Sequence, residues 1–426
     1  MARGLSLKGA FGLWESRINM NKLAIIDVSN RLGKGAPMSA LAFMAMLKGM
    51  QAGKLTLRLP TGDSCYFEGS ERGGNAELHI VDWRACSRIL RSGDIGFAEA
   101  YRDGWVDSPD LTKLIKLAVA NAGAFDAAVD GSWLGRAWHR LMHRLRPNTK
   151  AGSRRNIHAH YDLGNTFYGL WLDPTWTYSS AWFQGDFSRS LQEAQDAKYQ
   201  RIVDKLSLKP GMRVLEIGCG WGGFALHAAS RGIHVHGVTI SRAQLLVGTG
   251  RIRAAGLESL ANLEFCDYRD LGGEYDAVVS IEMFEAVGEA YWPGYFDVIR
   301  QRLKPNGCAL VQSITIDHKR FDAYRSSSDF IREYIFPGGM LPSPAVFSLQ
   351  AGNRGLQVTD AFAFGGDYAE TLRRWRDAFE KHLPAIRQQG FDEAFIRLWR
   401  LYFQYCEAGF DAGSIDLYQF ALRRDD

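Results

Sequence analysis

A strand-like run followed by closely spaced glycines limits what this chain can fold into. Val-Leu-Glu-Ile at 214–217 precedes four glycines within residues 218–223, and the apolar residues 224–226 follow. This order is typical of a strand, a tight turn and a helix. Glycines allow close approach of a ligand to the backbone, and a helix that begins there offers free N–H groups. The pattern predicts a turn that holds a nucleotide-type cofactor.

The glycine spacing and one acid narrow the choice of cofactor. The dinucleotide pattern is Gly-x-Gly-x-x-Gly, whereas residues 218–223 read Gly-Cys-Gly-Trp-Gly-Gly. Glu216 precedes the glycines, where a carboxylate attracts the amino and sulfonium end of S-adenosylmethionine and would repel a pyrophosphate. We therefore predict S-adenosylmethionine, and a plain glycine-rich turn is the structural alternative.

The region around this turn alternates strand-like and helical segments. Strands are predicted at 214–217, 234–239, 263–266, 277–281 and 309–314. Such alternation predicts an α/β fold, a doubly wound, Rossmann-like parallel sheet, in a catalytic domain over 156–426. Within it, 321–345 is rich in Pro, Gly and aromatic residues and is interpreted as an insertion that covers a substrate. Residues 366–408 are predicted to be helical.

The N-terminal part predicts a second, smaller domain. Residues 1–37 give no firm assignment. Beyond them, a helix is expected at 39–50, strands at 54–59, 64–68 and 76–80, and a helix at 111–119. We expect a small α/β domain over 38–120.

A basic segment is expected to link the two domains over 121–155. Leu134, Trp138, Leu141 and Leu145 fall on one side of a helical wheel, and arginines fall on the other. Between residues 133 and 160 there are seven Lys or Arg and no acid. A basic amphipathic helix suits an anionic bilayer surface, and it equally suits an interdomain helix with solvated arginines.

Composition excludes several classes of protein. The 426 residues carry a net charge of only +4, so no nucleic acid partner is expected. Six scattered cysteines without a Cys-x-x-Cys pair argue against a zinc site or a disulfide framework and suit a reducing cytoplasm. No apolar run approaches the length of a membrane span. We expect a cytoplasmic protein, peripheral on the inner face of the cell membrane.

The strand ends of the larger domain carry further motifs, and together these resemble a known family. The chain is similar to the cyclopropane-fatty-acyl-phospholipid synthases, which include the mycolic acid cyclopropane synthases, over about residues 90–420. The motifs are His160-Tyr-Asp-Leu-Gly-Asn165, Thr177-Tyr-Ser-Ser-Ala-Trp182, the glycine turn 216–223, Gly237–Ser241, Ser280–Gly288, Glu333–Ser343, Asp367–Leu372 and Tyr405–Phe410.

This resemblance implies a reaction and a cofactor site. The cis double bond of a phospholipid acyl chain attacks the methyl of S-adenosylmethionine, and loss of a methyl proton from the carbocation closes a cyclopropane ring. Membrane phospholipids with unsaturated acyl chains are thus the expected partners. Members are often homodimers through the smaller domain, so the domain over 38–120 is expected to bind lipid and to form the dimer. The implied cofactor contacts, with Glu216 added from the residues themselves, are Tyr178, Ser179, Glu216, Gly218, Gly220, Thr239, Ile240, Gln244, Tyr268 and Ile281.

The resemblance also implies a bound bicarbonate as the base, held by a Cys, a Glu, a His and a Tyr. Glu285 and Tyr368 match two of these positions, whereas Ser180 replaces the Cys and Gln312 replaces the His. Serine and glutamine still donate hydrogen bonds, but they do not supply the proton that His can. Cys406 lies in a family motif and is included as a catalytic candidate, although a buried structural thiol is the favoured interpretation.

Three alternatives to cyclopropane formation stay open. The proton can leave from a neighbouring carbon, which gives a methyl- or methylene-branched chain. Methyl transfer to a heteroatom is disfavoured because no dedicated base for an O or N acceptor is recognised. An inactive lipid-binding protein is disfavoured by the intact glycine turn and by Glu285.

Overall fold

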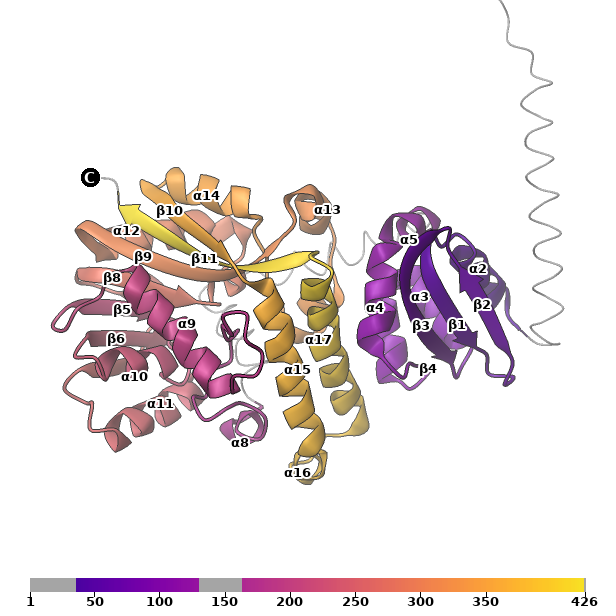
Figure 1. Cartoon of the computed structure of the whole chain (residues 1–426), viewed down its shortest axis with the longest axis horizontal. Coiled ribbons are helices and arrows are strands. Elements are labelled where there is room, and N and C mark those ends of the chain that lie inside the picture. Colours follow the sequence, from indigo (N-terminus) through magenta and orange to yellow (C-terminus); the bar gives the residue numbers. More distant parts are fainter. Residues whose placement is uncertain (1–35, 130–162, 425–426) are drawn as a thin grey trace, which may run out of the picture. The chain divides into compact units, whose positions relative to one another are not determined.

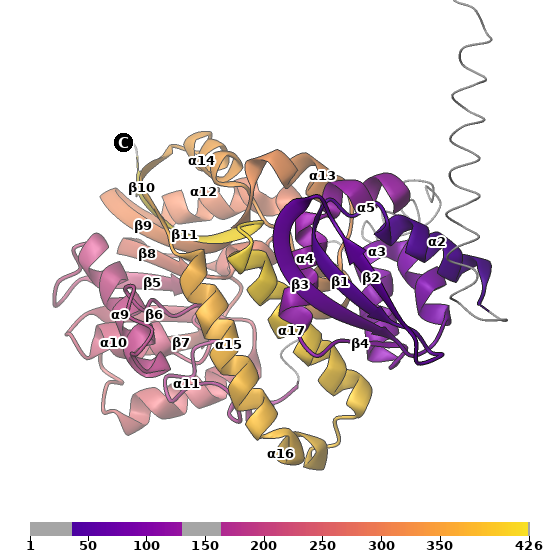
Figure 2. The same cartoon turned by 45° about the vertical axis from the view of Figure 1, so that its right-hand side comes forward.

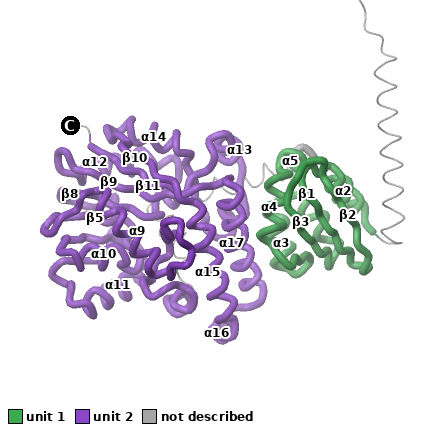
Figure 3. Tube along the Cα trace, viewed as in Figure 1, with its two compact units in different colours: residues 1–135 green, residues 136–426 purple. Residues whose placement is uncertain are grey.

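The computed structural model describes residues 36–129 and 163–424. Residues 1–35 and residues 130–155 of the predicted basic segment, which include its expected amphipathic helix, therefore lie outside the described residues. The chain divides into two compact units, 1–135 and 136–426 (Figure 3), and each is considered by itself.

The first unit combines a four-stranded sheet with helices. Its elements are α2 (Met38–Leu47), β1 (Ala52–Arg58), β2 (Ser64–Glu68), β3 (Glu71–Ile80), α3 (Arg84–Arg102), β4 (Val106–Asp107), α4 (Leu111–Ala120) and α5 (Ala122–Val129). The sheet order is β2-β1-β3-β4, with β1 and β3 parallel. The helices and strands expected between 38 and 120 are present, with shifted ends. The lipid-binding and dimerisation roles of this unit stay predictions.

The second unit is built on a seven-stranded sheet (Figure 1). Its strands are β5 (Arg213–Ile217), β6 (His234–Thr239), β7 (Ala261–Phe265), β8 (Tyr275–Ile281), β9 (Leu303–Ile316), β10 (Leu356–Ala363) and β11 (Ile415–Arg424). Their order is β10-β11-β9-β8-β5-β6-β7. The five strands predicted from the sequence form the parallel part, which confirms the Rossmann-like α/β fold. Two further strands at the C-terminal end were not predicted from the sequence: β11 pairs antiparallel to β9, and β10 pairs antiparallel to β11.

Two apolar cores cover the two faces of this sheet. Leu215 and Val278 belong to the core that contains Trp292 of α12 (Trp292–Arg302). Their strand neighbours Val214 and Val279 belong to the other core, with helices α9 (Leu191–Lys205), α10 (Gly223–Ala229) and α11 (Arg242–Ala254). Because successive residues of a strand point to opposite faces, each face is buried under helices.

Further helices complete this unit. The segment expected to be helical over 366–408 forms α15 (Gly365–Lys381), α16 (Leu383–Gln388) and α17 (Glu393–Asp411), and Figure 2 shows α15 and α17 running side by side. The remaining elements are α8 (Asn165–Tyr168), α13 (Phe321–Ser326), a π-helical turn (Ile331–Ile335) and α14 (Pro344–Gly352). The insertion expected over 321–345 is tied to the sheet end, since Met340 N donates to the Glu285 carbonyl at 2.8 Å.

Candidate active site

The glycine turn after β5 has the backbone conformation that the sequence predicted. Gly218 and Gly220 have φ values of +80° and +52°. A Cβ on Gly218 would lie 2.8 Å from Cγ of Met283, whereas a Cβ on Gly220 would point into open space. Both positions therefore favour glycine, and the turn presents bare backbone at the edge of the sheet where ligands bind in this fold.

Glu216 presents a buried carboxyl beside this turn. It is 3% exposed, and Oε2 has no hydrogen-bond partner among the described residues. Burial raises the pKa of Glu216 to about 8, and the charge of Lys198 opposes this rise. A buried acceptor without a partner is costly, and the ammonium group of a bound amino acid would satisfy it. The site therefore fits the S-adenosylmethionine that the sequence predicted.

The end of β6 adds ordered polar groups. Thr239 Oγ1 donates to Gln244 Oε1 at 3.0 Å, and the Ser241 N–H donates to Thr239 Oγ1 at 3.1 Å. Ser241 also caps α11 by accepting from the Gln244 N–H. Ile240, between these residues, is half-buried.

Two other predicted cofactor contacts follow β7 and end β8. Tyr268 is half-buried, and its ring meets that of Tyr295 edge-on, with centroids 5.7 Å apart. Burial raises the pKa of Tyr268 to about 12, so the hydroxyl stays protonated at neutral pH. Ile281 is the last residue of β8 and is half-buried.

Tyr178 lies in an enclosure of aromatic rings. Its hydroxyl is 2.9 Å from that of Tyr402, and its ring centroid lies 5.5 Å from Trp171 and 5.3 Å from Trp375. Aromatic faces attract cations, so the enclosure suits a sulfonium or a carbocation. The next residue, Ser179, is buried and accepts a hydrogen bond from Lys198.

Three of the four residues expected to hold bicarbonate instead bind the carboxylate of Glu282. Oε1 accepts from the Ser180 N–H at 2.9 Å and from Gln312 Nε2 at 2.7 Å. Oε2 accepts from the Tyr368 hydroxyl at 2.7 Å. Burial raises the pKa of Glu282, while the charge of Lys198 and these hydrogen bonds oppose the rise. A carboxylate with a raised pKa is well suited to accept a proton near neutral pH.

These donors are fixed by their own surroundings. Gln312 Oε1 accepts from Gln419 Nε2 at 2.9 Å, which turns the Gln312 amino group toward Glu282. The Ser180 hydroxyl donates to the Ala181 carbonyl at 2.8 Å. With their donor groups engaged, these residues do not fit a bicarbonate beside Glu282. Bicarbonate stays a prediction, and this geometry disfavours it.

The backbone of Glu282 is unusual. Its φ is +50°, in the left-handed region, and its N–H donates to the Gln312 carbonyl at 2.8 Å. A non-glycine residue in that region is strained by about 1–3 kcal/mol, and such strain gathers at functional sites. Glu282 lies within the motif Ser280–Gly288, but no role was predicted for it from the sequence. Its position directly after a strand end was the available signal.

Glu285, the predicted catalytic acid, lies three residues further on. Its Oε1 accepts from the Ile314 N–H at 2.5 Å, and its Oε2 is buried without a partner in the described part of the chain. Burial, followed by the nearby charge of Glu282, raises the pKa of Glu285 to about 8. At neutral pH this carboxyl is therefore largely protonated, whereas Glu282 carries three hydrogen bonds that favour its charged form.

Cys406 lies near this group, since its thiol acts electrostatically on Tyr368, one of the three donors to Glu282. It is half-buried on α17, and burial raises the pKa of its thiol. A thiol with a raised pKa is a poor nucleophile, which favours a structural role. Within residues 36–129 and 163–424 no group of three or more His, Cys, Asp and Glu side chains is arranged to hold a metal ion.

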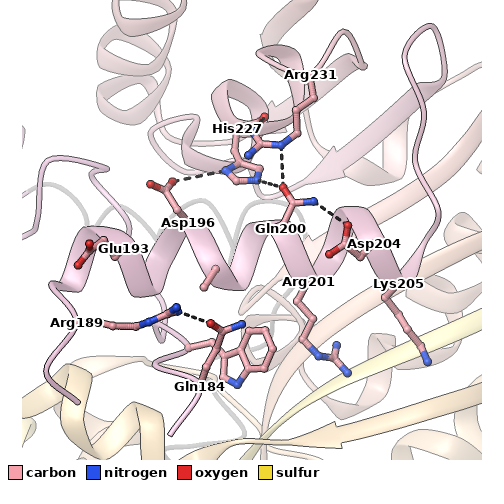
Figure 4. A pocket seen from close by; sticks show the side chains of 12 residues that line it. Gln184, Arg189, Glu193, Asp196, Gln200, Arg201, Asp204, Lys205, His227 and Arg231 are labelled. Carbon is pink, nitrogen blue, oxygen red and sulfur yellow. Dashed lines mark hydrogen bonds and ion pairs between the residues drawn. The ribbon is translucent and has the colours of Figure 1, made fainter. Parts of the chain in front are cut away.

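A polar pocket of about 740 Å³ is lined by residues of α9 and by His227 and Arg231 (Figure 4). Polar side chains of this pocket contact one another: His227 contacts Gln200 and Asp196, and Arg189 donates a hydrogen bond to Gln184. None of the predicted site residues lines this pocket. Its charged walls do not suit an acyl chain.

Comparison with known proteins identifies relatives over most of the chain. The profile of the family described as mycolic acid cyclopropane synthetase matches residues 148–420. The chain is 40% identical over 390 residues to the tuberculostearic acid methyltransferase UfaA1 of Mycobacterium tuberculosis, which covers 87% of this chain and 88% of that protein. It is 35% identical over 366 residues to the cyclopropane-fatty-acyl-phospholipid synthase of Escherichia coli K12, covering 82% of this chain and 88% of that protein.

Solved structures of related enzymes share this fold. The structure of mycolic acid cyclopropane synthase CmaA1, complexed with SAH and CTAB, matches with a TM-score of 0.60 at 31% identity. It covers 66% of this chain and 100% of that one. The cyclopropane synthase MmaA2 of Mycobacterium tuberculosis matches with a TM-score of 0.60 at 30% identity, over 66% of this chain and 99% of that one.

Proposed function

Because the chain belongs to the mycolic acid cyclopropane synthetase family of S-adenosylmethionine-dependent methyltransferases, we propose that it methylates the cis double bond of unsaturated phospholipid acyl chains. The observation that carries this proposal is the Glu282 carboxylate, which is held beside the cofactor turn and three residues from the buried Glu285.

The cofactor side of the proposed reaction rests on the β5 turn. Bound S-adenosylmethionine supplies a methyl group on a sulfonium, which is an electrophile for an alkene. Glu216 would accept hydrogen bonds from its amino group, and the bare backbone at Gly218 and Gly220 would allow close approach. Thr239 and Gln244 would bind polar groups of the nucleoside, and Tyr268 would face its base. Ser179, Ile240 and Ile281 complete the proposed contacts.

The acyl side of the reaction needs an acceptor for one proton. Attack of the double bond on a methyl group leaves a carbocation on the acyl chain, which the enclosure around Tyr178 would stabilise. Glu282 would then accept the proton that the carbocation loses. Tyr368, Gln312 and the Ser180 N–H would hold that carboxylate in place. Glu285, largely neutral, would line the site without competing for the proton.

The site of proton loss decides the product. Loss from the new methyl group closes a cyclopropane ring, the product named for the Escherichia coli relative. Loss from a neighbouring chain carbon gives a branched chain, and the replacement of the family's Cys and His by Ser180 and Gln312 favours this second product. The relative that is 40% identical is named as a methyltransferase of a different fatty acid, tuberculostearic acid.

One experiment tests the proposed function. The purified protein is incubated with unsaturated phospholipid vesicles and S-adenosylmethionine that carries a ¹³C methyl group. We expect mass spectrometry to find acyl chains that gain one labelled CH₂. Proton NMR then separates a cyclopropane from a branched alkene, which share a mass. Acyl chains without label would contradict lipid methylation.

The roles of Ser180 and Gln312, which differ from the family's residues, can be tested by measuring the products. Ser180→Cys combined with Gln312→His should raise the cyclopropane fraction, because these changes restore the family's residues around Glu282. An unchanged product ratio would remove both positions from the choice of product.

Binding to an anionic membrane surface is proposed from the basic segment 121–155. Across the residues that the structure describes, no helix is long and apolar enough to span a bilayer. Attraction by arginines is screened by salt, so sedimentation with anionic vesicles should weaken as ionic strength rises. Salt-insensitive sedimentation would point to a different contact. We also propose a cytoplasmic location and a homodimer, and light scattering tests the homodimer.

A further inference from the structure

Helix α9 buries a lysine beside the candidate active site. Lys198 is 0% exposed, and its Nζ donates to Ser179 Oγ at 2.7 Å. The ammonium also lies 4.5 Å from the ring centroid of Tyr199. A buried ammonium is unfavourable unless carboxylates compensate its charge. The surroundings of Lys198 therefore indicate what it does.

Acids from three other segments act on this ammonium. The strongest attraction comes from Glu282 after β8, followed by Asp173 after α8 and Glu216 of β5. Burial outweighs these charges and lowers the pKa of Lys198 to about 7. Burial, followed by the charge of Arg231, lowers the pKa of the His227 imidazole on α10 to about 4, and the charge of Lys198 adds to this effect.

Helix α9 also forms hydrogen bonds to the 179–180 segment, which contacts Glu282. Gln195, one turn before Lys198, donates from Nε2 to the Ser179 carbonyl at 2.9 Å. The hydroxyl and the carbonyl of Ser179 are therefore both bound by α9. The next N–H along the chain, that of Ser180, donates to Glu282 Oε1. Lys198 thus acts on Glu282 by its charge and by a short chain of contacts.

The start of α9 is fixed independently of the site. Ser190 accepts from the Glu193 N–H, and the Glu193 side chain accepts from the Ser190 N–H, which together form a capping box. A helix with a fixed start places Lys198, which lies two turns further on, at a defined depth beneath the site.

We propose that Lys198 is a positioning residue that keeps the Glu282 carboxylate ionised and holds the 179–180 segment against it. It touches neither the reacting carbon nor the methyl group. The role of Glu282 as proton acceptor rests on the proposed function, whereas the attraction between Lys198 and Glu282 does not.

The first test is the pH dependence of kcat in two neutral variants. Lys198→Gln keeps a donor for Ser179, and Lys198→Met removes both the donor and the charge. In both variants, the acidic limb of the profile should move up by about one pH unit or more. Activity at pH values below the wild-type midpoint should then fall about tenfold and recover at higher pH. Lys205→Met is the matched control on the same helix, because Lys205 pairs with Asp360 at 3.1 Å. Loss of activity by an equal factor at every pH would overturn the proposal.

The second test does not depend on activity. The Glu282 carboxyl is followed by ¹³C NMR in protein labelled at glutamate carboxyls, and its signal is assigned by its loss in Glu282→Gln. The titration midpoint should rise by about one unit or more in Lys198→Gln. An unmoved midpoint would overturn the proposal. A midpoint that moves in a protein that methylates no lipid would instead overturn the proposed function and leave the attraction between Lys198 and Glu282 intact.

Discussion

Two neighbouring regions of the second unit place buried acids in contrasting settings. At the glycine turn, Glu216 keeps one carboxyl oxygen free of hydrogen bonds among the described residues. After β8, both oxygens of Glu282 are taken by donors from three different segments. A carboxyl oxygen without a hydrogen-bond partner can accept a hydrogen bond from a ligand, whereas a carboxylate that accepts hydrogen bonds on both oxygens is fixed in position. The difference supports the proposal that the first region binds the cofactor and that the second takes part in the reaction.

The largest effect is expected from Glu282→Gln. Loss of the proton acceptor should lower kcat by about 10²–10⁴-fold, the range typical of a lost general base. Cofactor affinity, measured by calorimetry, should change little because the glycine turn is untouched. Glu289→Gln, an exchange at the acid that pairs with Arg325, is the control. If Glu282→Gln weakened the cofactor and spared kcat, the division between the two regions would collapse.

The converse change is Glu216→Gln. Losing a charged hydrogen bond should weaken S-adenosylmethionine binding by about 10- to 100-fold, which corresponds to roughly 1.5–3 kcal/mol. The value of kcat at saturating cofactor should stay within a small factor of the original. Calorimetry and steady-state kinetics separate the two quantities. An undiminished affinity would remove Glu216 from the cofactor site.

A smaller effect is expected when one of the donors to Glu282 is lost. Gln312→Leu deletes the bond to Oε1 and leaves Gln419 without its acceptor. We expect kcat to fall roughly tenfold, in line with a hydrogen bond to a charged group. Tyr368→Phe should act similarly through Oε2. Wild-type rates in both variants would show that Glu282 does not need to be held.

The smallest effect concerns stability. The pKa of Glu285 is raised in the folded state, to about 8 from 4.5, so the folded protein loses stability as pH rises through this range. Glu285→Gln removes the titrating group. Its melting temperature should match that of the wild type below about pH 4.5 and exceed it by a few degrees above pH 8. An equal difference at all pH values would contradict the raised pKa.

The two regions also differ in how far the sequence predicted them. The glycine turn was predictable because positive φ values and a strand–turn–helix order leave a local signature. The acid cluster was predicted only in part: Ser180, Gln312 and Tyr368 do converge, but on the side chain of Glu282. They come from segments as much as 188 positions apart in the chain, and no local pattern gives the direction of a side chain after a strand end.

Lys198 illustrates the same limit. On a helical wheel a lysine is expected to be solvated, and here it is fully buried. Only the packing of α9 against the 177–182 segment and the end of β8 explains why. The two added antiparallel strands were missed for a similar reason, since pairing across a sheet depends on partners that are distant in sequence.

The central claim, that Glu282 is a built-in proton acceptor in place of bicarbonate, is tested most directly by one assay. Methylation of unsaturated phospholipid is measured in buffer freed of carbon dioxide and again with added bicarbonate, for the wild type and for Glu282→Gly. The wild type should be equally active in both buffers, and the variant should be inactive until bicarbonate is added. A wild-type enzyme that stops without bicarbonate would contradict this account.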